Sequence, residues 1–576
     1  MLYIVFYWEY FFFCLILFIV EGVYIKKLFI FFIAVICFFA IDVSAAEYTV
    51  SSEGELSSAL SAQTESDTIN LNADIKINKS HAITGNVVIN GNGHVLSFDD
   101  SYVGTMFTVG GTLEIINLKF NGNNDWYWLT EEARVDPMIY EDETTLFAGD
   151  KKISNNVIEV TGTLKISSSQ IYNYYIDGAI GDTNCFIKAS GADSKVIIDS
   201  TTVDTLFGSF ITMVGGRVEF NNNSKIINSY GLGNKGSFFK QNGGELVINN
   251  GILKDNCGRA RSGTLIGAVN NALVTFNSGL IDNNLAKYHG SASTGSMITV
   301  ESGAGFIMNG GTISNNIGTL ASVVSSRWTN DPDDKGIHLN NGVIKNNTTY
   351  KNTWLGSSVF LRNNCTVGEN MTIDGDVVVN NTNASLENNG TINGKVTLND
   401  STAKVVNNGN ISDLDLLKGE CTNNNAINNV YELDTQITNN GVVTGKYVKE
   451  LSNVEGKIII RFDLNDGKEK DTGYTVIDNV YDLNYKLLDT DIPIVERDGY
   501  TFEGWFSDAE FTKKLDLNTE YSENAVIYAK WLKIPEVVVP DTALNISTIV
   551  MTLSIILMFT GSIIMYVTIN KKKVEE

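Results

Sequence analysis

Apolar and polar residues alternate in short stretches along most of this chain, and the stretches return at intervals. Four of them read NNGILKDN, NSGLIDNN, NGGTISNN and NNGVIKNN. The apolar residue just before each phrase is Ile248, Phe276, Met308 and Leu339 in turn, so the copies are 28, 32 and 31 residues apart. Alternation is the period of a β-strand, and a repeat of about 20 to 50 residues is typical of stacked architectures.

The same apolar position can be followed upstream, in the order Ile89, Ile116, Ile166, Ile198 and Phe220. The units hold no apolar run at helical spacing that is long enough for a crossover helix, which disfavours helical repeats. Uneven steps suit a solenoid of strands, because only the strand positions must stack while the loops between them lengthen freely. The sequence therefore predicts one coil of short parallel strands per repeat, with inward apolar residues stacked in columns.

Asn and Gly fall at the expected bends of each coil. Gly adopts positive φ without a steric cost and Asn tolerates it better than most residues. Stacked Asn side chains can also hydrogen-bond along the axis, as in cross-β arrays. We therefore expect the recurring Asn residues to form turns and ladders rather than to bind a ligand. After residue 365 the phrases NNGTING and NNGNISD are only 19 residues apart, which predicts a slimmer final section.

The opening of the repeat region predicts a cap. Glu55, Leu56, Ala59 and Leu60 suggest a short amphipathic helix, and solenoids need caps because an exposed strand edge invites aggregation. The segments DTINLNADI and NVVINGNG follow as the first coils. Residues 47–450 resemble the right-handed parallel β-helix of pectate-lyase-like proteins and bacterial adhesins. The resemblance implies an all-β fold, and the repeat length gives about fourteen coils.

A second domain begins where the Asn-rich phrasing fades. Its matching residues are Phe462, Pro493, Gly499, Tyr500, Thr501, Phe502, Gly504, Trp505, Tyr528, Ala529, Lys530 and Trp531. On these, residues 458–531 resemble the Listeria–Bacteroides repeat (the internalin B-repeat), which implies a small β-grasp-like module of a secreted bacterial surface protein. Gly499 and Gly504 are typical of turns or close approaches. We expect Phe502, Trp505 and Trp531 in a core rather than against a ligand, because so small a module needs its large apolar residues inside.

The two ends of the chain predict where it resides. Lys26 and Lys27, the apolar run 28–41 and the small residues of VSAA have the order of a secretory signal peptide, so residues 1–46 are predicted to end in one. The apolar stretch before it is either upstream sequence read from a mis-assigned start or a first membrane segment. Residues 544–570 are almost wholly apolar and long enough to span a bilayer as a transmembrane helix. The basic tail 571–576 is then cytoplasmic and the body lies outside.

The linker 532–543 contains a further motif. A Pro-x-Thr step, an apolar helix and a basic tail resemble the sortase cell-wall sorting signal of Gram-positive bacteria, with the matching residues Pro540, Asp541, Thr542 and Ala543. The family's usual motif is Leu-Pro-x-Thr-Gly, whereas this chain has Val539 for the Leu and Ala543 for the Gly. A sortase and the cell wall are therefore expected partners, and a plain linker before a membrane anchor is the alternative.

The net charge of the chain disfavours one class of binding partner. The 576 residues carry a net charge of −24, which disfavours nucleic acid because nothing neutralises its phosphates. Only 5 residues are Pro, as suits a chain of strand ladders. Cys185, Cys257, Cys365 and Cys421 are far apart and form no C-x-x-C, so they are predicted to be buried single thiols rather than a zinc site or a disulfide framework.

Catalytic motifs of this fold are missing. The R-x-P-x-x-R phrase of the pectate lyase family and the N-T-D, G-H-G and R-I-K phrases of the polygalacturonase family do not occur. Arg259 and Arg261 form the best basic spot, which we expect to be a solvated loop. NDPDDKG at 330–336 could hold Ca²⁺ but is more typical of a surface turn. No catalytic residue, metal site or cofactor is expected, and the chain is predicted not to be an enzyme.

Tryptophan residues mark the candidate binding loops. Trp126, Trp128, Trp328 and Trp354 are four of the seven Trp, and they stand in insertions rather than in the repeated phrases. Loops on a rigid scaffold usually carry binding, and Trp faces near carboxylates suit sugar rings or a protein partner. The alternative is that these loops fold back and bury the Trp residues on the coil.

These patterns lead to one expected function and two rivals. We expect a bacterial surface protein, anchored outside a Gram-positive-type cell, that acts as an adhesin by binding carbohydrate or a surface protein of a host or neighbouring cell. One rival is a secreted carbohydrate-active enzyme, a polysaccharide lyase or hydrolase. The other is a passive surface stalk.

Overall fold

The computed structural model describes residues 46–62, 67–126, 147–148, 151–176, 184–286, 296–318, 321–327, 335–349 and 357–535. The chain divides into two compact units, Met1–Glu450 and Leu451–Glu576.

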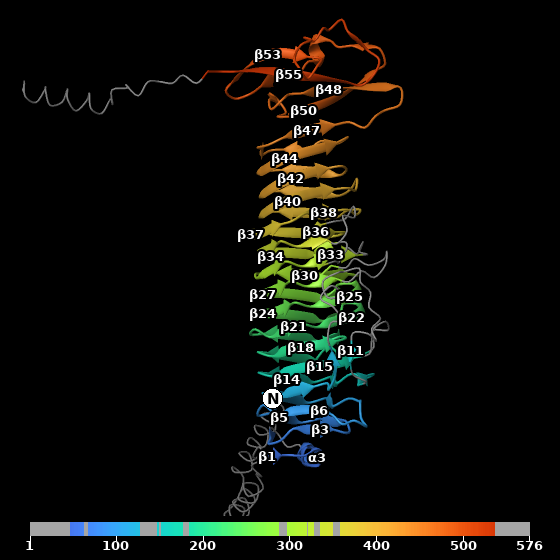
Figure 1. Cartoon of the computed structure of the whole chain (residues 1–576), viewed down its shortest axis with the longest axis vertical. Coiled ribbons are helices and arrows are strands. Elements are labelled where there is room, and N and C mark those ends of the chain that lie inside the picture. Colours follow the sequence, from blue (N-terminus) through green and yellow to red (C-terminus); the bar gives the residue numbers. More distant parts are fainter. Residues whose placement is uncertain are drawn as a thin grey trace, which may run out of the picture. The chain divides into compact units, whose positions relative to one another are not determined.

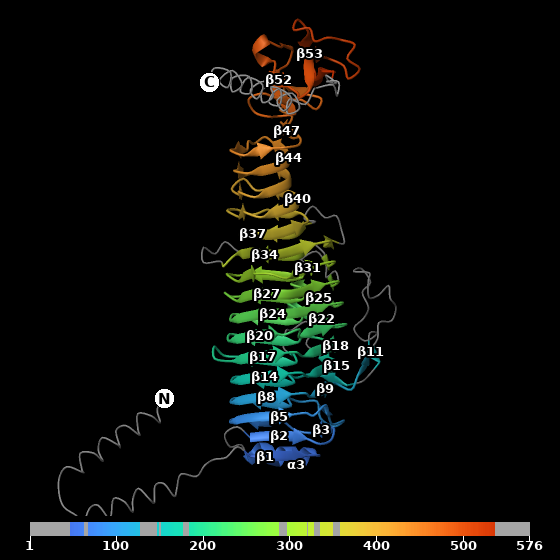
Figure 2. The same cartoon turned by 90° about the vertical axis from the view of Figure 1, so that its left-hand side faces the viewer.

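The first unit is built from parallel strands stacked in columns, which run from β1 (Glu47–Val50), beside the helix α3 (Glu53–Ala62), to β47 (Tyr447–Glu450) (Figures 1 and 2). The first column holds sixteen strands, each paired with the next. They are β1 (Glu47–Val50), β2 (Asp67–Leu71), β5 (Asn86–Asn90), β8 (Thr112–Ile116), β14 (Thr163–Ser167), β17 (Lys195–Asp199), β20 (Arg217–Asn221), β24 (Glu245–Lys254), β27 (Leu273–Asp282), β30 (Gly305–Met308), β34 (Ile337–Lys345), β37 (Asn364–Asp374), β39 (Ser385–Asn388), β41 (Lys404–Asn407), β43 (Glu420–Asn423) and β45 (Thr438–Asn439).

Two further columns complete each coil. The second contains β3 (Ile75–Ile77), β6 (Val95–Phe98), β9 (Lys119–Asn121), β15 (Gln170–Ile176), β18 (Thr202–Phe207), β21 (Lys225–Ile227), β31 (Thr312–Ser314), β40 (Thr391–Leu398), β42 (Asn410–Leu416), β44 (Ala426–Leu433), β46 (Val442–Val443) and the ends of β24, β27, β34 and β37. The third contains β4 (His81–Ile83), β7 (Phe107–Val109), β13 (Ile158–Val160), β16 (Ile187–Ser190), β19 (Ile211–Val214), β23 (Phe239–Asn242), β26 (Ile266–Val269), β29 (Ile298–Glu301), β33 (Ala321–Arg327), β36 (Ser357–Leu361), β38 (Val377–Val379), the ends of β40, β42 and β44, and β47 (Tyr447–Glu450).

A side column lies between the second and third columns in the middle coils. It contains β12 (Lys152–Ile153), the ends of β15 and β18, β22 (Tyr230–Lys235), β25 (Cys257–Ser262), β28 (Leu285–Ala286), β32 (Ile317–Gly318) and β35 (Thr348–Thr349). The pairings agree with the predicted parallel β-helix, whose right-handed sense stays a prediction. Arg259 and Arg261 lie in strand β25, so the prediction of a loop there is wrong.

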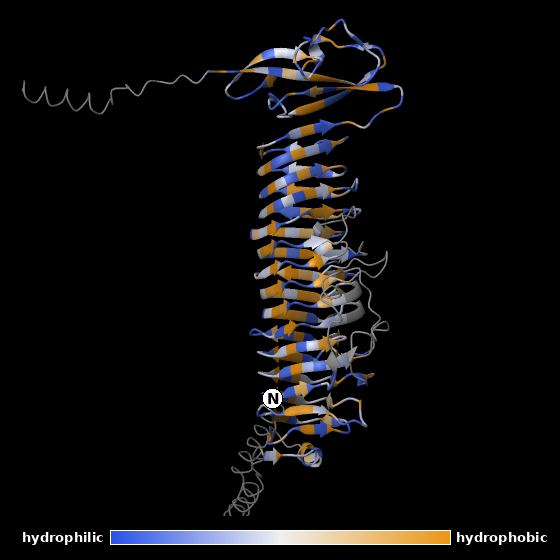
Figure 3. Ribbon diagram, in the orientation of Figure 1, coloured by the Kyte–Doolittle hydropathy of each residue, from blue (hydrophilic) through white to orange (hydrophobic). Residues whose placement is uncertain are grey.

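The predicted apolar column is present with one error of register. Ile248, Phe276 and Met308 lie opposite one another and are at most 1% exposed, and along the strands apolar and polar residues alternate as Figure 3 shows. Upstream, the residue that pairs with Ile89 and Ile166 is Ile115, not Ile116. Successive strand residues face opposite sides, so Ile115 is buried in the core while Ile116 is only partly buried.

Asparagine replaces the apolar residues at the end of this same column. Val367 pairs with Asn388, which is followed by Asn407, Asn423 and Asn439 at spacings of 19, 16 and 16 residues. Asn388, Asn407 and Asn423 each donate from Nδ2 to Oδ1 of the next Asn, at 2.7–2.8 Å. The predicted slimmer section is confirmed. In its shorter coils single strands such as β40 serve both the second and the third columns.

A second Asn ladder follows the repeated phrases that the sequence singled out. Asn249, Asn277, Asn309 and Asn340 each donate from Nδ2 to Oδ1 of the Asn one coil earlier, at 2.8–2.9 Å, starting from Asn221. Satisfied amide ladders stabilise stacked coils. The prediction that the recurring Asn residues are structural is confirmed for this ladder.

The predicted cap is a helix, α3 (Glu53–Ala62), whose buried residues are Leu56, Ala59 and Leu60. The Glu53 carboxylate lies next to the His81 side chain of β4, with 3.3 Å between Oε1 and Nε2. The helix thus packs its apolar side on the first coils, as the sequence predicted.

The second unit contains a four-stranded mixed sheet. β48 (Lys457–Asp463) lies between β50 (Val476–Asp482), to which it is antiparallel, and β55 (Ala525–Lys533), to which it is parallel; β53 (Tyr500–Phe506) pairs antiparallel with β55. Short pairs join β49 (Lys468–Glu469) to β52 (Val495–Glu496) and β51 (Tyr485–Lys486) to β54 (Glu520–Tyr521), and η2 (Asp489–Asp491) is a 3₁₀ turn. The mixed sheet agrees with the β-grasp-like module that the resemblance implied.

The structure does not describe the segments predicted for secretion and membrane anchoring. Within the described residues no helix is long and apolar enough to cross a membrane. The signal segment up to residue 45, the sorting residues Pro540, Asp541, Thr542 and Ala543, and the span 544–570 all lie outside the described residues.

Candidate binding surfaces

The long insertion between β9 and β12 has a rigid base. Asn124, 1% exposed, donates from Nδ2 to the Lys151 carbonyl at 2.9 Å and accepts the Lys151 N–H at 3.2 Å. Lys151 in turn donates from Nζ to the Phe98 carbonyl at 2.9 Å. One buried amide therefore ties the two ends of the insertion together, so that the segment leaves and re-enters the coil at one place.

Trp126 lies two residues after Asn124, whose two hydrogen bonds to Lys151 we call the Asn124 clamp. Trp126 belongs to β10 (Asp125–Trp126), which pairs antiparallel with β11 (Phe147–Ala148), so the insertion begins as a short hairpin. A two-residue pair set on a buried clamp fixes where the segment starts. The remaining predicted ligand-binding residues, Trp128, Trp328 and Trp354, lie outside the described residues, as does the acidic phrase that ends in Asp334.

The described ends of the insertions show where each is attached. The segment with Trp354 leaves the side column at β35, and the insertion that begins at Trp126 returns to the coil at β12, so each segment adjoins one end of the side column. Seven rungs separate β12 from β35, which is about 34 Å at the spacing of parallel strands. Trp328 directly follows the C-terminal end of β33, a strand in the middle of the third column. The structure therefore attaches the segments that contain the predicted binding residues at separate points of the coil.

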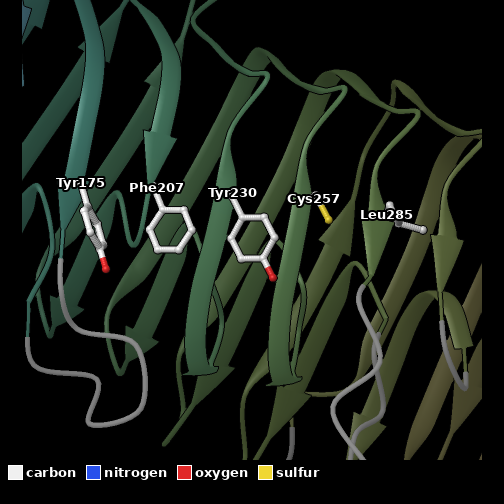
Figure 4. Close-up of a cluster of buried hydrophobic side chains, with 5 residues drawn as sticks. All are labelled: Tyr175, Phe207, Tyr230, Cys257 and Leu285. Atoms are coloured by element: carbon white, nitrogen blue, oxygen red, sulfur yellow. The ribbon is translucent and has the colours of Figure 1, made fainter. Parts of the chain in front are cut away.

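An aromatic stripe that the sequence did not single out lies between these attachment points. Figure 4 shows Tyr175, Phe207, Tyr230, Cys257 and Leu285, one on each successive rung of the side column. Tyr174 packs inward against Phe186, and neighbouring strand residues face opposite sides, so the stripe lies on the outer face. Its members are at most 8% exposed. It is therefore a second packed layer rather than an open platform for a ligand.

Charged groups on the first column are paired with one another. Arg217 hydrogen-bonds Glu219 at 2.9 Å and contacts Glu245, and Lys195 lies 3.5 Å from Glu219. The Arg217 hydrogen bond holds the pKa of Glu219 below its ordinary value, and the same bond raises the pKa of Arg217. Arg217 and Glu219 are therefore both charged at neutral pH and form an ion pair. In the part of the chain that the structure describes, no group of three or more His, Cys, Asp or Glu residues could hold a metal ion.

All four expected thiols are single and buried. Cys185, Cys257, Cys365 and Cys421 are free of disulfides and at most 2% exposed, as predicted. Burial raises the pKa of Cys365 and of Cys421 to about 12. They act as small core residues and offer no thiolate for chemistry at neutral pH.

The second unit has an apolar groove. A cavity of about 510 Å³ is lined by Ile492, Pro493, Ile494, Phe502, Trp505 and Leu515, among others. The predicted core is confirmed for Trp505, which is 6% exposed and packs edge-on against Phe462 at 5.2 Å. Trp531 is half-buried and donates from Nε1 to the Leu464 carbonyl. For Phe502 the prediction of a core position is wrong, because 37% of it is exposed at the groove.

Comparison with known families confirms both resemblances, each over part of the chain. Residues 47–174 match the family model of the pectate lyase-like adhesive domain. Residues 459–530 match that of the Listeria-Bacteroides repeat domain. Together the two matches indicate a surface adhesin-like protein, and the first describes an adhesive domain rather than an enzyme. No curated protein and no solved structure matches the chain significantly.

Proposed function

We propose that this chain is a cell-surface adhesin that binds carbohydrate or a surface protein of a host or neighbouring cell through the loops of its β-helix. The observation that carries the proposal is the Asn124 clamp, which presents the insertion beginning at Trp126 from a fixed base. Binding loops on rigid scaffolds lose little conformational freedom on binding. The match of the same coils to an adhesive domain supports the proposal.

The ligand-contacting residues in this proposal are Trp126, Trp128, Trp328 and Trp354. Their attachment points are spread along and around the coil, which suits an extended ligand such as a polysaccharide or a protein surface. Aromatic faces stack on sugar rings and act as anchors in protein interfaces. The proposal includes anchoring through residues 544–570 and a sortase acting at Thr542, which mass spectrometry of the C-terminus of cell-wall material would test.

The binding test uses recombinant residues 47–531 with a panel of polysaccharides and surface glycoproteins, scoring retention and chain cleavage in the same samples. We expect retention without cleavage. Asn124→Ala frees the base of the insertion and should weaken retention, whereas Asn155→Ala, an exposed Asn near the far end of the same insertion, should not. Cleavage of any panel member would favour the carbohydrate-active enzyme. Absence of both signals would favour the passive stalk.

A further inference from the structure

The groove of the second unit lies beside an unpaired strand edge. In the described part of the chain, Tyr500–Gly504 of β53 pairs only with β55, and the next contact on the other edge is the bridge from Phe506 to Lys514. The Trp505 carbonyl accepts the Leu515 N–H at 2.8 Å on that outer edge. The Tyr500 N–H donates to the Arg497 carbonyl at 3.1 Å. The backbone groups of Thr501–Gly504 that point away from β55 have no such partner among the described residues and can pair with another strand.

Apolar side chains continue from this edge into the groove. Ile494 is 66% exposed and Phe502 is 37% exposed, and both line the cavity of about 510 Å³. Gly504, at φ +135°, adds no side chain on the strand itself, and the Lys514 stem covers it, since a Cβ there would lie 3.3 Å from Lys514 Cε. An exposed apolar surface next to free backbone groups has the features of a site for strand addition.

The charged residues at the groove indicate which charge a bound peptide segment would carry. Asp489 lines the groove and Asp516 stands between two of its lining leucines, and neither carboxylate pairs with a Lys or Arg within the described ranges. Hydrogen bonds from Asn518 lower the pKa of Asp516, which is therefore charged at neutral pH. Lys514 is the one cation that lines the groove among the described residues, and the chain as a whole carries −24. A second copy of this chain would meet like charge, whereas a cationic segment would be attracted.

We propose that the β53 edge of the second unit binds an extended, lysine- or arginine-bearing peptide segment of a partner protein. The segment pairs its backbone with Thr501–Gly504 and inserts an apolar side chain between Ile494 and Phe502. Its basic residues lie near Asp489 and Asp516. This interaction is independent of the β-helix loops and would add a protein contact to a carbohydrate contact elsewhere on the same chain.

The test measures binding of a dye-labelled peptide, Lys-Val-Lys-Val-Tyr-Val-Lys-Val-Lys, by fluorescence anisotropy. The full chain is held in nanodiscs of neutral phosphatidylcholine, with empty discs as the blank. Ile494→Asp places a charge in the groove, and Leu483→Asp makes the same kind of change at a residue that is 50% exposed but does not line it. Because both residues are exposed, neither variant is expected to disturb folding.

We expect Ile494→Asp to weaken peptide binding at least about tenfold and Leu483→Asp to change it less than about twofold. A peptide with Pro on both sides of its Tyr keeps the charge but cannot form the ladder, and should lose binding. A peptide with Glu in place of each Lys should lose it as well. The proposal is overturned if the parent peptide does not bind by about 1 mM, if the two protein variants behave alike, or if the Pro or Glu peptide binds equally well. Retention of polysaccharide by residues 47–531 is read separately, so failure of either proposal is distinguishable.

Discussion

Replacement of Asn407 by Val should open the last coils of the β-helix. Asn407 is fully buried, accepts a hydrogen bond from Asn388 at 2.8 Å, and donates to Asn423 Oδ1 at 2.8 Å and to the Ala426 carbonyl at 3.1 Å. Val is somewhat larger than Asn and branches at Cβ rather than Cγ, but it suits a column that is apolar farther upstream, so the main effect of the change is the loss of hydrogen bonds. Loss of these three hydrogen bonds of a buried side chain, at about 1 kcal/mol each, should lower the local free energy of unfolding by about 3 kcal/mol.

Local hydrogen exchange is the appropriate assay, because a long solenoid does not unfold as a single two-state unit. The Asn424 N–H, which donates to the Asn407 carbonyl at 2.7 Å, reports the rung directly. A local loss of about 3 kcal/mol should speed its exchange about a hundredfold. Asn408→Val is the matched control, since Asn408 is exposed and its ladder bonds to Asn389 and Asn424 can be replaced by water.

Two outcomes would refute this reasoning. If Asn407→Val and Asn408→Val speed exchange equally, burial does not determine how much free energy each Asn ladder contributes to the stability of the coil. The ladder account also predicts that Val at Asn388, Asn407, Asn423 and Asn439 together restores most of the protection, because no buried side-chain amide is then left without a partner. A quadruple variant less protected than Asn407→Val alone would contradict it.

Three further predictions concern the register, the cap and the thiols. Ile115→Ala should cost about 3 kcal/mol of local stability and Ile116→Ala less than about 1 kcal/mol, as measured by exchange in β8, because only Ile115 is in the core. Burial lowers the pKa of His81 below its ordinary value, so the unfolded state binds more protons than the folded one. Stability of the α3 cap should then fall as the pH drops below about 6.5; exchange in α3, corrected for its intrinsic pH dependence, should show this fall, and His81→Gln should remove it. Cys365 and Cys421, with pKa values of about 12, should react with iodoacetamide at pH 8 only after denaturant is added, and labelling of the folded chain would contradict their burial.

The sequence predicted the repeat because stacking demands the same residue types at each rung. Ile248, Phe276 and Met308 had to be apolar to fill a narrow core, and Asn249 and Asn277 could form ladders only one coil apart. Those constraints are local and periodic, so they are visible in one chain. The candidate binding residues lacked such a signal, since residues of the insertions, such as Trp126, obey no period.

The errors have physical causes as well. In the run TLEIINL two neighbouring Ile residues are apolar, and a period of two does not say which of them faces inward; only the pairing of Ile115 with Ile89 and Ile166 decides it. Phe502 was expected in a core by its size, but the bulge between Phe502 and Gly504 and the distant segment around Ile494 leave it at an open groove.

By itself, therefore, the sequence determined a coiled, all-β solenoid with Asn ladders, a helical cap, shorter final coils and a small aromatic module. The tertiary structure decided which face each residue takes, where Asn takes over the inward column, that the Tyr175–Phe207–Tyr230 stripe is covered, and that the insertion at Trp126 is clamped by Asn124. The reason is the range of the interactions. Periodicity is set by neighbours along the chain, whereas burial and clamping depend on residues that meet only after the coils have stacked.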